Sequence, residues 1–351
     1  MTTGRRGAWW ALALALPVVL ATACTHSPNP PVGLTSSPRQ TTAAPTAVPG
    51  PGAHADLYVN HDDDLEGLDT SRLHPGQPAL PDALATHVTL PPATYDITRL
   101  AGRILAMSDK GSVTLVVPTT GKVERSLTVT PQMLGEPTFT SLILDETEST
   151  PDHEIAYVAG RFGRPKQRAF VGFVIGFDTE LHVTTARKFN DVVQRLAADE
   201  DGAVAVLTEG RIVDAVTGTI LREPTYERAE EAIAIRRIAG GLWIAVGDNG
   251  SPFLLTPVGK VVLPSAQAYP IALVAIPGGV VVICQGVDAV YIVTGTHVRT
   301  VKVPQTGAGA VLVGSTLYVL SAGSDTLTRI DLADGGSTAQ YMLPQVSALV
   351  A

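Results

Sequence analysis

Six prolines recur at nearly constant spacing through most of this chain: Pro91, Pro131, Pro224, Pro264, Pro304 and Pro344. Four of the five gaps between them are 40 residues, and the fifth, from Pro131 to Pro224, is two such periods plus 13 residues. A fixed period of this length, built from short β-runs, is typical of propellers and related repeat arrays. We therefore expect an all-β fold made of repeated units.

The unit that ends at Pro304 shows the template. Its four predicted strands are Ile271–Ile276, Val280–Cys284, Ala289–Val293 and His297–Val303. Glycine-containing turns separate them, so the unit reads as one propeller blade of four antiparallel strands. The inner strands are almost continuously apolar, as expected for strands buried on both faces. The proline lies just past the fourth strand, where its missing N–H breaks no ladder.

The two ends of the repeat region complement each other. After Pro344 there is room for one inner strand, Val346–Val350, and no more. Near the start, Asp56–Asn60, Leu65–Thr70 and Thr86–Leu90 read as a second, third and fourth strand. We expect the C-terminal strand to pair with the N-terminal ones in one composite blade. Six whole blades and this one predict a closed, seven-bladed β-propeller without open sheet edges.

The last unit carries a family resemblance. Its segment 318–332 contains, in order, Tyr318-Val319, Ser324-Asp325-Thr326 and Ile330-Asp331. This resembles the bacterial repeat named for its Tyr-Val-Thr-Asn (YVTN) signature, although Leu320-Ser321 replace Thr-Asn. The resemblance implies a seven-bladed extracytoplasmic propeller, and it implies no particular function because fold and function are separable.

The N-terminal residues read as a targeting segment. Arg5 and Arg6 precede an apolar run over 9–23, which is shorter than a typical membrane-spanning helix. The run ends in Leu20-Ala21-Thr22-Ala23-Cys24, which resembles the lipobox of bacterial lipoproteins. This predicts a signal peptide over 1–23 and lipidation of Cys24, with palmitate-type acyl chains that hold the protein on the extracytoplasmic face of the cell membrane. An ordinary secretory signal with an incidental cysteine is the alternative.

Residues 24–54 are rich in Pro, Ser, Thr and Ala, with too few large apolar side chains to form a core. We predict a flexible tether there, and the propeller domain over 55–351.

Composition narrows the range of partners. The formal net charge of −8 becomes −10 without Arg5 and Arg6, which disfavours nucleic acid and anionic lipid headgroups. Beyond Cys24 the only cysteine is Cys284, within an apolar run, where we expect a buried core residue instead of a reactive thiol.

The unit after Pro131 is irregular. Its extra residues fall in Glu146–Asp152 and Gly160–Arg168, which we interpret as insertion loops. The second segment contains four cations and reads either as a solvated hairpin tip or as a partner-docking loop.

Several blades have an acidic residue in the turn between the second and third strands. These candidate ligand-binding residues are Asp62, Asp63, Asp64, Asp109, Asp248, Asp288 and Asp325. Such turns lie on one face of a propeller, around the mouth of its channel, where carboxylates could hold Ca²⁺. Alternatively, each Asp caps its own turn. We assign no cofactor and no metal ligand, with Ca²⁺ as the one possibility left open.

No local catalytic motif occurs in the chain. There is no paired-histidine metal motif, Gly-x-Ser-x-Gly elbow or phosphate-binding loop, and we name no catalytic residue. The sequence therefore favours a non-enzymatic, membrane-anchored lipoprotein whose propeller binds or scaffolds an envelope partner. The alternative is a propeller hydrolase or lactonase with Ca²⁺ at the channel mouth.

Overall fold

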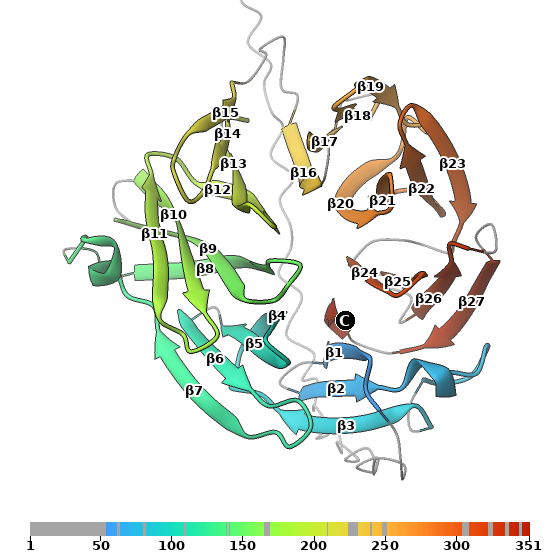
Figure 1. Ribbon diagram of the computed structural model, residues 1–351, viewed down its shortest axis with the longest axis horizontal. Helices are drawn as coiled ribbons and strands as arrows, with labels where there is room; N and C mark the ends of the chain where they lie inside the picture. Colours follow the sequence, from blue (N-terminus) through green and yellow to red (C-terminus); the bar gives the residue numbers. More distant parts are fainter. Residues whose placement is uncertain are drawn as a thin grey trace, which may run out of the picture. The chain divides into compact units, whose positions relative to one another are not determined.

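Seven four-stranded antiparallel sheets are arranged in a ring in the computed structural model (Figure 1). The structure describes residues 54–351, except 62–63, 80–81, 109, 138, 140, 165–168, 209, 224–230, 239–240, 248–250, 304–308, 322–325, 334–336 and 344–345. The predicted seven-bladed β-propeller is therefore confirmed. Cys24 and the predicted signal peptide lie outside the described residues, as does the predicted tether apart from His54. Within the described part, no helix has the length and apolar character that a membrane span requires.

Blades are numbered along the chain, and their strands are given from the centre of the ring outward (Figure 1). Blade 1 consists of β28 (Val346–Val350), β1 (Leu57–His61), β2 (Asp64–Leu68) and β3 (Leu84–Thr89). Blade 2 consists of β4 (Thr94–Leu100), β5 (Arg103–Ser108), β6 (Ser112–Val116) and β7 (Val123–Thr128). Blade 3 consists of β8 (Ser141–Ser149), β9 (Ile155–Arg164), β10 (Ala169–Asp178) and β11 (Val183–Phe189). Blade 4 consists of β12 (Val193–Asp199), β13 (Gly202–Leu207), β14 (Ile212–Asp214) and β15 (Ile220–Arg222).

Blade 5 consists of β16 (Glu231–Ile238), β17 (Gly241–Gly247), β18 (Phe253–Thr256) and β19 (Gly259–Val262). Blade 6 consists of β20 (Tyr269–Ile276), β21 (Gly279–Gln285), β22 (Ala289–Thr294) and β23 (His297–Lys302). Blade 7 consists of β24 (Gly309–Val313), β25 (Thr316–Ser321), β26 (Thr326–Asp331) and β27 (Ser337–Met342). Two short 3-10 helices, η1 (Thr70–Arg72) and η2 (Pro131–Leu134), lie in the connections.

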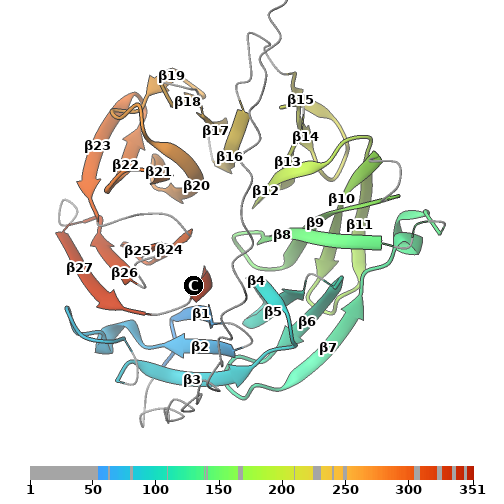
Figure 2. The ribbon, with the colours of Figure 1, turned by 180° about the vertical axis from the view of Figure 1, so that it is seen from behind.

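The predicted closure of the ring is also confirmed. β28 pairs antiparallel with β1, with Tyr58 opposite Val350 and Val59 opposite Leu349. The two strands lie side by side in both ribbon views (Figures 1 and 2). A second tie joins blades 1 and 7, because the connection between β2 and β3 runs along the outer edge of β27. There the N–H of Ala79 donates to the carbonyl of Met342 at 2.9 Å.

The core is divided among the blade interfaces. Each of the seven hydrophobic clusters joins two adjacent blades of the ring. In β21, Val280 and Val282 belong to the cluster shared with blade 5, whereas Val281 and Ile283 belong to the cluster shared with blade 7. Successive side chains of a strand point to opposite faces, so burial of both faces requires a continuous apolar run.

Cys284 belongs to the cluster between blades 5 and 6 and has no exposed surface. Burial raises the pKa of its thiol to about 12, so the reactive thiolate is strongly disfavoured. The prediction of a buried core cysteine is confirmed.

The prediction of insertion loops in blade 3 is wrong in part. Glu146 to Ser149 belong to the inner strand β8, and Gly160 to Arg164 continue β9. The extra residues therefore lengthen the strands: β8, β9 and β10 contain 9, 10 and 10 residues. The run Asp145-Glu146-Thr147-Glu148-Ser149 has no apolar residue, so its composition resembled that of a loop. The tip of the lengthened hairpin, residues 165–168, lies outside the described residues.

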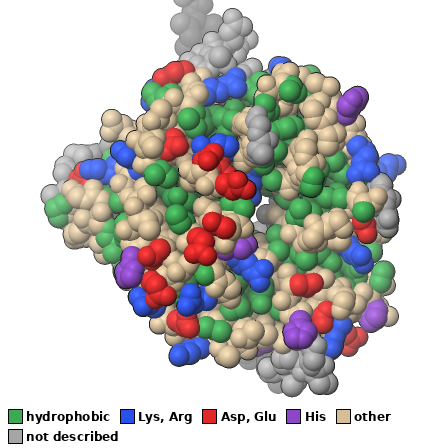
Figure 3. Space-filling model, in the orientation of Figure 1, with side chains coloured by type: hydrophobic (Ala, Val, Ile, Leu, Met, Phe, Trp, Pro, Cys, Tyr) green, Lys and Arg blue, Asp and Glu red, His purple; other side chains and the backbone are tan. Residues whose placement is uncertain are grey.

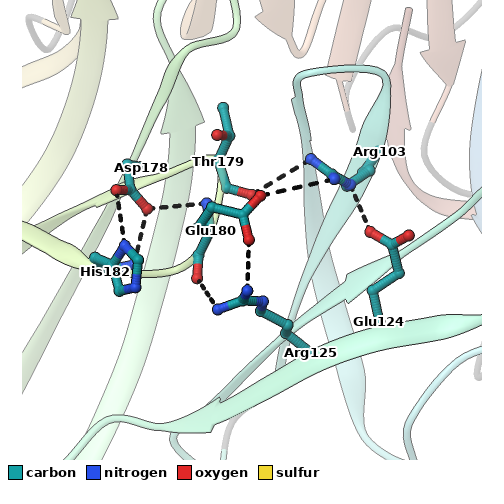
Figure 4. Close-up of polar contacts among 7 residues, drawn as sticks. All are labelled: Arg103, Glu124, Arg125, Asp178, Thr179, Glu180 and His182. Carbon is teal, nitrogen blue, oxygen red and sulfur yellow. Dashed lines mark hydrogen bonds and ion pairs between the residues drawn. The ribbon is translucent and has the colours of Figure 1, made fainter.

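Because strands alternate in direction, the turns of all blades fall on two faces. The first-turn face carries the turns between first and second strands and between third and fourth strands. The second-turn face carries the turns between second and third strands. On the first-turn face, an ionic network ties blade 2 to blade 3 (Figure 4). Arg125 contacts Glu180 at 2.5 Å, and Arg103 contacts Glu124 at 2.6 Å while reaching the carbonyl of Thr179.

Candidate binding site on the first-turn face

Charge is unevenly distributed among the inner strands. Those of blades 2 to 5 all carry ionisable residues, such as Asp96, Glu146, Arg195 and Arg236. Those of blades 6, 7 and 1 are Tyr-Pro-Ile-Ala-Leu-Val-Ala-Ile, Gly-Ala-Val-Leu-Val and Val-Ser-Ala-Leu-Val, without any charge. In Figure 3, charged side chains accordingly gather beside the centre over blades 3 to 5. One half of the ring thus surrounds its centre with charged strands and the other half with apolar ones.

A repeated β-bulge positions three of these charged residues. The pairing register shifts immediately before Asp96 in β4, Glu146 in β8 and Arg195 in β12. A bulge adds one unpaired residue and re-aims the side chain that follows it. The three residues therefore occupy equivalent positions in blades 2, 3 and 4.

The carboxylates of Asp96 and Glu146 each accept a backbone N–H group on the inner edge of the next blade. An inner strand pairs with a second strand on one side only, which leaves backbone groups on its other edge. Asp96 accepts the N–H of Thr147 in β8 at 2.9 Å, and Glu146 accepts the N–H of Leu196 in β12 at 2.7 Å. Each bond links one blade to the next at the centre of the ring.

Burial shifts both carboxyl groups toward the neutral form. It raises the pKa of Asp96 to about 7 and the pKa of Glu146 to about 8. The negative charge of Glu148 contributes to both of these increases. Such pairs of perturbed carboxyl groups are characteristic of functional sites, although ionic networks with a structural role produce them too.

A cavity of about 420 Å³ opens at the first-turn ends of the inner strands of blades 3 to 6. Its polar lining consists of Asp199, Glu200, Asp201, Arg236 and Arg237. Its apolar lining includes Pro151 from the β8–β9 turn and Ala275 from β20. The cavity therefore lies where the charged half of the ring meets the apolar half.

The two arginines of the cavity are held differently. Arg237 forms a two-pronged contact with Asp199, with Nη2 donating to Oδ1 at 2.7 Å, and its Nη1 lies 3.8 Å from Asp214. The Asp199 hydrogen bond raises the pKa of Arg237 above its already high value. Arg236 instead donates from Nη1 to Glu148 at 3.2 Å, and 24% of its side chain is exposed. Arg237 is thus enclosed by carboxylates, and Arg236 stays accessible.

Two acidic residues of the cavity have no such partner. Glu200 and Asp201 are exposed in the turn between β12 and β13. Within the described part of the chain, neither carboxylate forms an ion pair or a hydrogen bond, although the charge of Asp201 helps to raise the pKa of Arg237. They are available to a ligand or partner.

The acidic residues proposed from sequence lie elsewhere. Asp64, at the start of β2, is 3.8 Å from Nε2 of His87, and Asp288 is exposed in the turn between β21 and β22. They belong to blades 1 and 6 on the second-turn face and are separated by blade 7. Asp62, Asp63, Asp109, Asp248 and Asp325 lie outside the described residues. No group of three or more potential metal-ligating side chains occurs among the residues described. Calcium binding by the acidic turns stays a prediction.

The cavity residues were missed from the sequence because they come from four different blades. The charged residues at the same repeat position in blades 2, 3 and 4, namely Asp96, Glu146 and Arg195, do not line the cavity. Their recurrence was a signal for the charged inner strands only. An alignment of the repeats reveals it only when β8 is recognised as an inner strand.

Comparison with known proteins supports the fold alone. No family model matches the chain, and no curated protein matches it. Among solved structures, dihydro-heme d1 dehydrogenase NirN in complex with DHE has a TM-score of 0.54 at 11% identity, covering 86% of this chain and 77% of that one. The β-propeller domain of Myceliophteria thermophila Cps50 (Swd1) has a TM-score of 0.52 at 12% identity, covering 72% and 88%. The computationally designed protein Ika8 also has a TM-score of 0.52 at 12% identity, covering 84% of this chain and 86% of that one. The resemblance to YVTN-repeat proteins stays a prediction.

Proposed function

We propose that this protein is a non-enzymatic binding module, a lipid-anchored extracytoplasmic propeller that engages an envelope partner through its first-turn face. The observation that carries this proposal is the pair of exposed carboxylates, Glu200 and Asp201, at the rim of the cavity, which form no ion pair with any side chain that the structure describes. Exposed Asp152 and Glu154 lie in the β8–β9 turn, next to Pro151 of the same cavity. We infer that the partner presents a basic surface, because complementary charge speeds and orients docking.

Anchoring is the part of the proposal that rests on sequence. Cys24 is the predicted acylation site, and the Pro-rich segment after it would hold the propeller away from the lipid. The alternative of a Ca²⁺-dependent hydrolase rests on the acidic turns, and five of their seven candidate residues lie outside the described residues.

Photocrosslinking in living cells tests the docking face. A photoreactive p-benzoylphenylalanine replaces Glu154 on the first-turn face or, as the matched control, Asp288 on the second-turn face. We expect one discrete adduct from position 154 and none from position 288. Equal labelling from both faces, or no adduct from position 154, would contradict the proposal.

Fractionation tests the anchor. Cys24→Ala removes the acylation site, and we expect the variant to move from the membrane fraction to the soluble fraction. A variant that stays entirely in the membrane fraction shows that the lipobox interpretation is wrong.

A further inference from the structure

We propose that the cavity on the first-turn face binds a small zwitterionic molecule with an apolar body, of the class of amino acids and short peptides with free termini. This goes beyond the docking role, because the ligand is a small molecule inside the cavity and not a protein on its rim.

The size and lining of the cavity suit such a ligand. Its volume of about 420 Å³ lies within the range of roughly 300–1,000 Å³ that small-molecule sites occupy. Half of the lining residues are apolar or small: Pro151, Ala198, Ile238, Gly241 and Ala275. Sites of this kind combine apolar walls with a few polar groups that orient the ligand.

Arg236 supplies the group that would hold a carboxylate. A guanidinium has five N–H donors in a planar fork, which matches the two oxygens of a carboxylate. One of these donors, on Nη1, is directed to Glu148 at 3.2 Å. The side chain lines the cavity and is 24% exposed, so part of the fork can reach a ligand. Arg237 is less suited, because Asp199 and Asp214 surround it.

Glu200 and Asp201 supply the groups that would hold an ammonium. They line the same cavity from the neighbouring blade 4, are exposed, and have no ion pair within the described residues. The cavity therefore presents an accessible cation and two accessible anions on different elements, with apolar surface beside them. A ligand with one charge of each sign and an aliphatic body satisfies all three features.

Calorimetric titration of the mature chain with three forms of one dipeptide tests this inference. The probes are leucyl-leucine, its N-acetyl form and its C-terminal amide. Loss of one well-formed ionic contact weakens binding by about tenfold or more. We therefore expect saturable binding of leucyl-leucine and at least about tenfold weaker binding of each capped form.

Variants assign each end of the dipeptide. In Arg236→Gln the free dipeptide and its amide should bind equally, and Arg236→Lys should restore part of the difference. In the Glu200→Gln, Asp201→Asn double variant the free and N-acetyl forms should bind equally. The matched control, Asp64→Asn with Asp288→Asn, removes the same charge from the other face and should bind as the parent does. Thermal melting of each variant verifies its fold.

Three results would overturn the inference: no saturable binding, equal binding of all three probes to the parent, or equal loss in the control variant. The crosslinking experiment uses no added ligand, so failure of this inference is distinguishable from failure of the proposed docking role.

Discussion

Arg236 in blade 5 donates a hydrogen bond to Glu148 in blade 3 at 3.2 Å, although the two residues are 88 positions apart and blade 4 lies between their blades. Such a contact is possible because the inner strands converge at the centre of the ring. The pair connects the cavity to Asp96 and Glu146, the two carboxyl groups with raised pKa values, because the charge of Glu148 acts on both.

Removing the charge of Glu148 should make its neighbours more acidic. In Glu148→Gln we expect the pKa values of Asp96 and Glu146 to fall, because a like charge that opposes their ionisation is lost. Carboxyl ¹³C NMR titration measures both. The stability loss should stay below about 1 kcal/mol, as is usual for partly exposed pairs. Glu154→Gln, on an exposed turn, is the control, and an equal pKa decrease there would contradict the assignment.

Stability should increase when the pH is lowered through neutrality. Asp96 has a pKa of about 7 in the folded protein and 3.8 as its ordinary value, so the folded state binds its proton more tightly. The resulting stabilisation is complete below the pKa of Asp96 in the unfolded chain and is lost as the pH rises through 7. The contribution of Glu146 is lost in the same way as the pH rises through about 8. Each pKa unit corresponds to about 1.4 kcal/mol as an upper bound.

We therefore expect the midpoint of thermal unfolding to rise as the pH is lowered from about 8.5 to about 5.5. The double variant Asp96→Asn, Glu146→Gln should flatten this dependence, because amide side chains do not titrate. The fold should be kept, because the amide oxygens still accept the N–H groups of Thr147 and Leu196. Differential scanning calorimetry across this range measures the effect. A pH profile that the double variant leaves unchanged would assign the dependence to other groups.

Deleting residues 346–351 should open the ring. The deletion removes β28, including Val346 and Leu349, which pack on the cluster between blades 7 and 1. It also exposes the edge of β1 to intermolecular pairing. We expect a loss on the order of 3 kcal/mol or more and concentration-dependent aggregation, measured by denaturant unfolding and size-exclusion chromatography. Deletion of Ala351 alone should have little effect, and full stability without β28 would refute closure by this strand.

Gly279 should tolerate no side chain. A Cβ at this position would lie 1.9 Å from the carbonyl oxygen of Val293, a backbone atom of the paired strand β22 that cannot move aside. We expect Gly279→Ala to destabilise the protein by about 2–3 kcal/mol, measured by urea unfolding. Gly309→Ala is the matched control, because no atom lies within 4 Å of its Cβ position. Equal stability of the two variants would contradict the close approach of β21 and β22 at this position.

The repeat architecture could be predicted from the sequence because every blade has to bury both faces of its inner strands. A strand covered on both faces needs a continuous apolar run, and Val280–Cys284 shows that run directly. The predicted closing strand, Val346–Val350, coincides with β28. The second half of β8, Glu146 to Ser149, was interpreted as a loop because it is polar. It is polar because it approaches the centre of the ring, where polar groups satisfy unpaired strand edges.

The linear sequence by itself determined the blade number, the strand order and the way the ring closes, since these follow from local turns and from the period of burial. Only the tertiary structure decided which charged residues meet. Glu148 and Arg236 belong to blades 3 and 5, and their contact depends on how seven sheets converge around one axis. That convergence brings together side chains that no spacing along the chain connects.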